Sequence, residues 1–325
     1  MAITGNASYI PTMNDFDAHW TLCNTALAPA VLLVAMPDQT SMTFAVFETL
    51  RDSLQTQQTV VQGTLNDQQI ARAQIEITKA TLLTKFNSFI DLLEAYYQQT
   101  KFFPARPKAP GIGDGQEHFT RPLIDAMTLW EKVNAAPAPA GVTLPLTLAD
   151  GTIQSAFASL VSSLQFSYKT EAAAGQNLAL ARVDRDALQA TAYAAMKSYR
   201  LAVPPRLAQH PNLVATLPAL TPAAGHTPAP VNVSGIFQAP DASKVTYTAS
   251  TDADLQEYQL RGTVGEHYSE DDAVVVATKQ PTDPREIVTT FGLTQPGARV
   301  ALKVFVILNT GNESGSATMV IVRPV

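Results

Sequence analysis

The first part of the chain has the hydrophobic spacing of amphipathic helices. Apolar side chains recur at steps of three and four residues, which places them on one face of a helix. One stretch begins at Met42 and a second covers residues 66–99; their apolar positions are Phe44, Phe47, Leu50, Leu54 and Val61, then Ile70, Ala73, Ile77, Ala80, Leu83, Phe86, Ile90, Leu93 and Tyr97. At about 1.5 Å per residue the second helix would be about 50 Å long, so we expect a partner helix of similar length.

Gly63 lies between these two stretches. Thr64 and Asp67 follow it and offer a capping pair for a new helix. We therefore favour a helical hairpin at Gly63 over one continuous helix.

The helical pattern occurs twice. A shift of 110 residues aligns residues 47–91 with residues 157–201 without a gap, and ten positions are identical. These are Phe47, Leu50, Ser53, Leu54, Gln55, Ala71, Arg72, Ala80, Thr81 and Ser88, which meet Phe157, Leu160, Ser163, Leu164, Gln165, Ala181, Arg182, Ala190, Thr191 and Ser198. We interpret this as a tandem repeat, with a coincidence of two Ala-rich helices as the alternative. Each half would contain a short helix, an extended apolar connector and two long helices.

Proline divides the chain further. Residues 203–230 contain seven prolines, which exclude a helix or central strand and predict an extended connector. Residues 104–115 are also rich in Pro and Gly and predict a loop between the repeats. The predicted domains are repeat 1 (1–103), an inter-repeat loop (104–122), repeat 2 (123–202), the linker (203–230) and a C-terminal domain (231–325).

After residue 231 the hydrophobic period changes to two. Seven β-rich runs separated by turn residues predict a β-sandwich. They are residues 231–237, 244–248, 255–260, 273–277, 287–291, 300–307 and 317–322. The predicted fold class is therefore a multidomain α and β protein, with an all-α bundle of two tandem repeats followed by an immunoglobulin-like sandwich.

This C-terminal domain resembles the fibronectin type III family. The resemblance rests on the turn at residues 291–297 (Phe-Gly-Leu-Thr-Gln-Pro-Gly), the long strand and hairpin at 301–314, and the closing strand at 317–322. Tyr247 stands where the family usually has Trp, and Val300 stands at its tyrosine-corner position. The resemblance implies a spacer or binding module without catalytic machinery. The whole chain looks like uncharacterised bacterial proteins that join a helical bundle to one such domain.

The amino-acid composition narrows the classes of binding partner that we expect. Charged residues make up only 15% of the chain, and the net charge is −6. No basic stripe with interleaved aromatics occurs, so we expect no nucleic-acid partner. No apolar run is long enough to span a membrane, and the N-terminus lacks the pattern of a signal peptide, which predicts a cytoplasmic protein or one exported by a non-classical route.

Few residues suggest chemistry. No two of the five histidines are spaced as ligands on one helix, and we predict no catalytic, cofactor-binding or metal-binding residues. An enzyme site near His19 or His118 is a weak alternative, because His19 lies beside Asp15, Asp17 and Cys23. Residues 111–115 (Gly-Ile-Gly-Asp-Gly) lack the rest of a nucleotide-binding motif. His210 and His226 are expected to be solvated in the linker.

The densest acidic cluster lies at residues 266–272. Its carboxylates could hold Ca²⁺ together with Asp252 and Asp254, although a solvated loop is the simpler interpretation. Exposed aromatics would favour carbohydrate binding, and Phe237, Tyr258 and Tyr268 are the candidates.

We therefore expect a non-catalytic structural, scaffolding or interaction protein. Its helical repeats would self-associate or dock on a protein partner, and the sandwich would be displayed. The alternative is a carbohydrate- or surface-binding protein that uses the sandwich loops. The shortage of charge predicts contact surfaces on the helices and linker.

Overall fold

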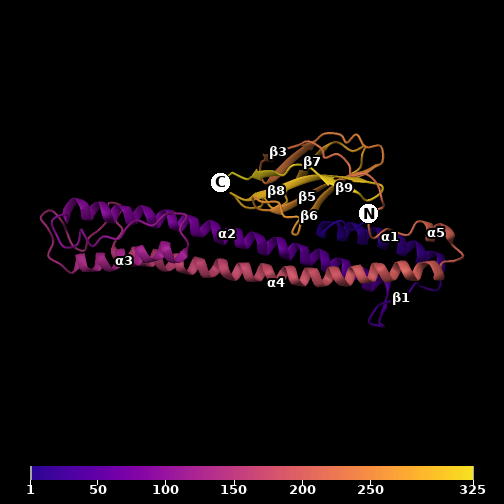
Figure 1. Cartoon of the computed structure of the whole chain (residues 1–325), viewed down its shortest axis with the longest axis horizontal. Coiled ribbons are helices and arrows are strands. Elements are labelled where there is room, and N and C mark those ends of the chain that lie inside the picture. The colour runs from indigo at the N-terminus through magenta and orange to yellow at the C-terminus, as the bar shows by residue number, and fades with distance from the viewer. Residues whose placement is uncertain (1, 325) are drawn as a thin grey trace. The chain divides into compact units, whose positions relative to one another are not determined.

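The computed structural model describes residues 2–324 and combines a long helical N-terminal part with a C-terminal β part (Figure 1). Met1 and Val325, the outer ends of the first and last predicted domains, lie outside the described residues. The helical part contains η1 (Asn6–Ser8), α1 (Tyr9–Leu27), β1 (Val34–Ala35), β2 (Ser41–Met42), α2 (Phe44–Tyr96), α3 (Gln116–Asn134), α4 (Gln154–Arg206) and α5 (Pro211–Ala215). Across residues 2–324, no helix combines the length and apolar character needed to cross a bilayer.

Helix α2 continues through Gly63, so the predicted hairpin at this position is wrong. Thr43 caps its start, where the side-chain hydroxyl accepts a hydrogen bond from the Val46 backbone N–H. Thr64, the expected cap, instead donates its hydroxyl back to the Val60 and Val61 carbonyls within the helix. The buried positions on both sides of Gly63 lie on one continuous seam, and this tertiary packing outweighs the low helix propensity of a single glycine.

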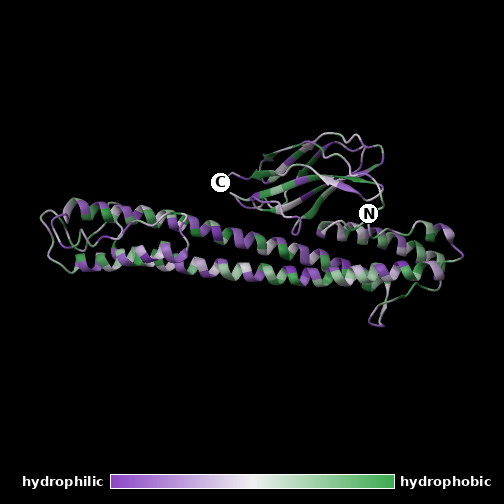
Figure 2. Ribbon diagram, viewed as in Figure 1, coloured by the Kyte–Doolittle hydropathy of each residue, from purple (hydrophilic) through white to green (hydrophobic). Residues whose placement is uncertain are grey.

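The seam of α2 follows a seven-residue repeat. Phe47, Leu54, Val61, Ile75, Leu82 and Phe89 are buried at intervals of seven, with Gln68 at the one remaining position. Helix α4 has the same spacing, with Phe157, Leu164, Leu178, Arg185, Ala192 and Tyr199 buried and Glu171 at the remaining position. A heptad spacing keeps one face of each helix against a partner, as in a coiled coil. In Figure 2 hydrophobic and hydrophilic residues accordingly alternate along both helices.

The chain divides into two compact units, residues 67–177 and the remaining residues on either side. The first unit holds α3 and the adjoining halves of α2 and α4 around one apolar core, with Trp130, Phe89 and Phe157 among its fully buried residues. The second contains the other halves of α2 and α4, which pack with α1 around Trp20, Phe16 and Tyr199. Each unit thus combines helical segments from both halves of the sequence.

The connectors after α1 and α3 share their hydrogen bonds. The Trp20 indole N–H donates to the Leu32 carbonyl, and the Asn24 side chain accepts from the Leu32 N–H. In the other unit, Trp130 donates to the Leu146 carbonyl, and Asn134 accepts from the Leu146 N–H. Trp20 and Trp130, like Asn24 and Asn134, are separated by the same 110 residues as the sequence repeat.

Part of the proline-rich segment is helical, contrary to the prediction for residues 203–230. Helix α4 includes Pro204 and Pro205, and α5 begins at Pro211. Neither proline can donate a backbone N–H to the carbonyl four residues before it, and α4 ends at Arg206 directly after them. Val203 and Leu207 on either side are buried in the core formed with α1, and this packing offsets the lost hydrogen bonds. Buried Leu207 and half-buried Leu213, Leu217 and Leu220 pack on the core formed with α1, which supplies the docking contacts expected for this segment.

The β part contains two antiparallel sheets. In one, β10 (Met319–Val322), β8 (Arg299–Leu308), β5 (Leu255–Val264) and β6 (Val274–Lys279) are neighbours in that order, and β9 (Glu313–Gly315) pairs with β8. The other has the order β3 (Val233–Gln238), β4 (Ala242–Tyr247) and β7 (Glu286–Thr289). Each of the seven predicted β runs overlaps one of these strands, and β9 is an additional short strand.

Both sheets contribute side chains to one core, including Val245 and Ile287 from one and Leu260, Leu302 and Val304 from the other. The turn after β7 contains Gly292 and Gly297 with φ of 65° and 77°, in the left-handed region that favours glycine. A Cβ at Gly292 would lie 2.4 Å from Val300 Cγ1, so this turn also requires glycine for space.

Candidate functional site

His19, which the sequence analysis considered as an enzyme site, belongs to a buried hydrogen-bond network. His19 Nδ1 lies 2.7 Å from the Tyr199 hydroxyl and 3.5 Å from Cys23 Sγ, and Nε2 lies 2.8 Å from the Leu213 carbonyl oxygen. Because a carbonyl only accepts hydrogen bonds, Nε2 carries a proton. Both ring nitrogens therefore have protein partners, and His19 is only 5% exposed.

The groups of this network are poorly suited to nucleophilic chemistry. Burial raises the pKa of the Cys23 thiol, although the hydrogen bond from Tyr199 opposes this effect. Burial also raises the pKa of Tyr199. Both groups are thus held in their neutral forms, whereas the thiolate is the reactive form of cysteine. Asp17, one of the three residues noted beside His19 in the sequence, forms an ion pair with Arg51.

The glycine-rich loop at residues 111–115 binds a lysine of its own unit. Lys79 Nζ donates to the carbonyl oxygens of Ile112 at 3.1 Å and Asp114 at 3.0 Å. The Asp114 carboxylate accepts a hydrogen bond from the Gly111 N–H. A phosphate-binding loop presents N–H groups to its ligand, whereas this loop turns carbonyl groups toward a cation. His118 lies just beyond it on an exposed face of α3.

The acidic cluster at residues 266–272 does not gather around one point. Glu266 pairs with Arg299, and Glu270 Oε1 lies 3.2 Å from Lys303 Nζ. The Asp272 carboxylate faces two arginines of α4 instead. Because these carboxylates point to different cations, their arrangement does not support the calcium hypothesis.

Asp272 forms a buried connection between the β5–β6 loop and α4. Arg182 donates to both carboxylate oxygens, with Nε–Oδ1 and Nη2–Oδ2 distances of 2.9 Å and 2.6 Å, and Arg185 Nη1 lies 3.5 Å from Oδ1. The side chains of Asp272 and Arg185 are only 2% and 5% exposed. A paired bidentate arginine compensates the buried carboxylate.

Helix α2 adds a polar contact to the same loop. The Gln62 side-chain amide donates to the Asp272 carbonyl, and its oxygen accepts from the Val264 N–H at 3.3 Å. Near the N-terminus, Asn6 Nδ2 donates to the Asp271 carbonyl at 2.9 Å. These contacts were not predicted from the sequence, although Arg185, a charged residue at a heptad position of α4, was a signal for a charged partner.

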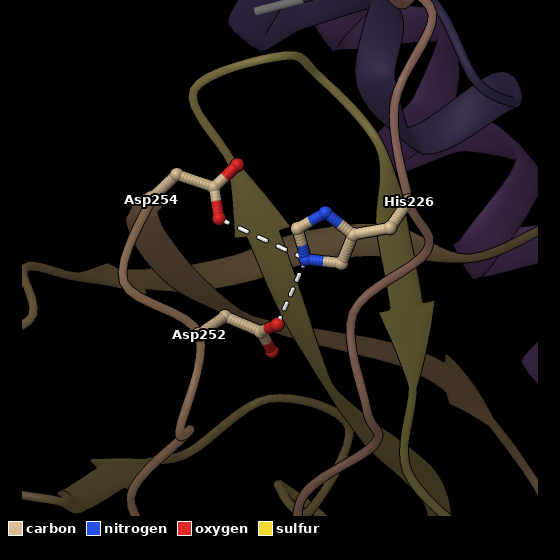
Figure 3. A group of neighbouring side chains, drawn as sticks. All are labelled: His226, Asp252 and Asp254. Atoms are coloured by element: carbon tan, nitrogen blue, oxygen red, sulfur yellow. Dashed lines mark hydrogen bonds and ion pairs between the residues drawn. The ribbon is translucent and has the colours of Figure 1, made fainter.

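A second group of acidic residues meets a histidine. His226 Nε2 lies 2.9 Å from Asp252 Oδ1 and 3.8 Å from Asp254 Oδ1 (Figure 3). The two aspartates lie in the loop between β4 and β5, and His226 lies in the segment before β3. The pKa of Asp252 is lowered, chiefly by the hydrogen bond with His226 and further by Ser250. His226 is exposed to solvent, as the sequence predicted, and it is also in contact with two carboxylates.

The aromatic candidates for carbohydrate binding have structural contacts. Tyr258 is 1% exposed and accepts a hydrogen bond from the Ser250 N–H. Tyr268 is half-buried against Phe305, with Lys303 Nζ 4.5 Å from its ring centroid. Phe237 is half-buried against the core of the two sheets. All three rings are buried or half-buried in contacts within the β part, so no observation here favours the carbohydrate hypothesis.

Comparison with protein-family models and with curated proteins gives no match. Among solved structures, similar chains include a Fn3-like protein from Clostridium thermocellum (17% identity, 31% of this chain and 97% of that one, TM-score 0.25) and the fn3 domain of human contactin 1 (15%, 31% and 80%, 0.25).

Another similar structure is the pectate lyase PelI from Erwinia chrysanthemi in complex with tetragalacturonic acid (13% identity, TM-score 0.24). The alignment covers 28% of each chain, so this chain matches under a third of the length of that enzyme. The structural neighbours of this chain thus include fibronectin type III domains, over about 30% of its length and at low TM-score.

Proposed function

We propose that this chain is a non-catalytic structural protein that associates with further copies of itself through α4. The observation that carries the proposal is a row of uncharged positions along the outer face of this helix. At intervals of seven the row contains Ser159, Phe166, Ala173, Leu180, Ala187, Ala194 and Leu201. Phe166, Leu180 and Leu201 are 70%, 64% and 72% exposed.

The row supports association on physical grounds. Its spacing matches the heptad of the buried seam, and an uncharged row with this spacing is of the kind that packs against another helix. Burying it would remove no charge from water, whereas an unpaired buried ion costs several kcal/mol. A second copy offers the same uncharged ridge, and this self-complementarity is what a two-fold interface requires.

The architecture that we propose for this role has two tandem helical repeats and a fibronectin type III-like sandwich. The matched Trp and Asn hydrogen bonds of the two connectors support the repeats. The shared core of the two sheets and the glycine turn at residues 291–297 support the sandwich. In this architecture the helices would make the contacts between copies, and the β part would be attached to each copy.

Sedimentation of a ridge variant tests the proposal. In the double variant Phe166→Gln and Leu201→Gln, we expect self-association at least about tenfold weaker than that of the native chain, because two exposed apolar anchors are lost. Val288→Gln is the matched control, since Val288 is 55% exposed but lies on strand β7. Equal weakening by the control, or none by the double variant, would contradict the assignment to α4.

A further inference from the structure

Three side chains of metal-binding type converge beside the β part. His226 comes from the segment before β3, and Asp252 and Asp254 come from the β4–β5 loop; one ligand atom from each lies within 4.8 Å of the others (Figure 3). Bonds of about 2.1 Å to a common ion place neighbouring ligand atoms roughly 3 to 3.5 Å apart. The observed separations of 2.9 Å and 3.8 Å from His226 Nε2 bracket that range.

The charge at this position is not balanced by the protein. In the part of the chain that the structure describes, no Lys or Arg forms an ion pair with Asp252 or Asp254. The carboxylates of Glu266, Glu270 and Asp272, by contrast, each face a Lys or Arg. A neutral imidazole would leave two adjacent negative charges, which a divalent cation would neutralise.

Asp252 is held in position by its neighbours. Ser250 Oγ donates a hydrogen bond to Asp252 Oδ2 at 3.0 Å and accepts one from the Asp252 backbone N–H at 3.2 Å. The side chain of Asp252 is 14% exposed, whereas those of Asp254 and His226 are 37% and 57% exposed. Hydrogen bonds of this kind orient a ligand while leaving its second oxygen available.

We propose that His226, Asp252 and Asp254 bind one divalent transition-metal ion, such as Zn²⁺. One imidazole and two carboxylates suit zinc, whereas Ca²⁺ favours a set of oxygen ligands only. Water completes the coordination, because the site faces solvent. The ion attaches the segment around His226 to the β4–β5 loop, so it stabilises the packing of the proline-rich connector on the β part.

Isothermal titration of the metal-free full chain with Zn²⁺ tests this site. We expect one ion per chain, and a rise in Tm on adding Zn²⁺ because the ion binds only the folded chain. His226→Ala should weaken zinc binding by at least about tenfold and abolish the rise in Tm. The double variant Asp252→Asn and Asp254→Asn should do the same, with circular dichroism confirming that each variant is folded.

His210→Ala is the control, because His210 is exposed in the same proline-rich segment but outside the cluster. It should leave zinc affinity unchanged. The proposal is overturned if the native chain binds no Zn²⁺, if His226→Ala binds it as well as the native chain, or if His210→Ala weakens binding equally. Tighter binding of Ca²⁺ than Zn²⁺ would also contradict the assigned metal class.

Discussion

Tyr199 is the centre of a buried polar network at the residue scale. Its hydroxyl contacts His19 Nδ1 and Cys23 Sγ, and the other nitrogen of His19 holds the Leu213 carbonyl. The network therefore links α1, α4 and α5 through one hydroxyl group. Such a network stabilises the fold only while every polar atom keeps a partner.

Removing this hydroxyl tests the network. We expect Tyr199→Phe to lower the free energy of unfolding by about 1–3 kcal/mol, because His19 Nδ1 loses its close partner inside the core. Chemical denaturation measures the change. Tyr193→Phe on the same helix is the control, since Tyr193 is 39% exposed. Equal stability of both variants would show that the hydroxyl contributes nothing.

Asp272 gives a second prediction at this scale. Asp272→Ala should lower the free energy of unfolding by about 1–3 kcal/mol, because Arg182 loses its bidentate partner and buried Arg185 keeps only the carboxylate of Asp186. Asp271→Ala is the neighbouring control: the Asp271 side chain is exposed, and only its backbone carbonyl binds Asn6 and Arg185. If the two variants unfold at the same denaturant concentration, the carboxylate is not the group that matters.

The raised pKa of Tyr247 predicts how the stability of the fold changes at alkaline pH. Burial is the main cause that raises its pKa from 10.0 to about 12. The unfolded chain therefore ionises this tyrosine first, so its contribution is fully present below pH 10 and is lost as the pH rises through about 12. Denaturation across that window should show falling stability, with a shallower fall in Tyr247→Phe. An identical pH profile for that variant would argue against the shift.

At the element scale, the long helices depend on the spacing of their buried faces. Periodicity located the amphipathic stretches of α2, but the hairpin predicted at Gly63 was wrong, because a glycine followed by a capping pair also occurs within one continuous helix. The strands were easier to locate, because each β run is bounded by turn residues. The prediction for Pro204 and Pro205 was wrong, because burial of Val203 and Leu207 holds the end of α4 helical although the two prolines donate no N–H.

Gly63→Ala tests the continuity of α2. Gly63 is exposed, and a Cβ placed there would meet no atom within 4 Å. In a continuous helix this substitution should raise the free energy of unfolding by about 0.5–1 kcal/mol. The comparison is Gly175→Ala in α4, where the new Cβ would lie 3.0 Å from Gln68 Nε2 and the gain should be smaller. Destabilisation by Gly63→Ala would indicate a bend at this glycine.

At the scale of the whole molecule, the sequence was informative about organisation and poor in information about sites. Composition and periodicity separated the helical part from the β part. The contacts of His226 with Asp252 and of Asp272 with Arg182 could not be predicted from the sequence, because the paired residues are 26 and 90 positions apart. The small number of charged residues still predicts contact surfaces: the row from Ser159 to Leu201 on α4 contains no charged residue, and Arg185 and Asp272 form an internal pair.

The central claim is that this chain associates with copies of itself through its long helices. Light scattering coupled to size-exclusion chromatography measures the mass of the native chain directly, from low to high micromolar concentration. The account predicts a mass that rises above that of one 34.8 kDa chain as concentration increases. A constant mass of one chain at every concentration would contradict it.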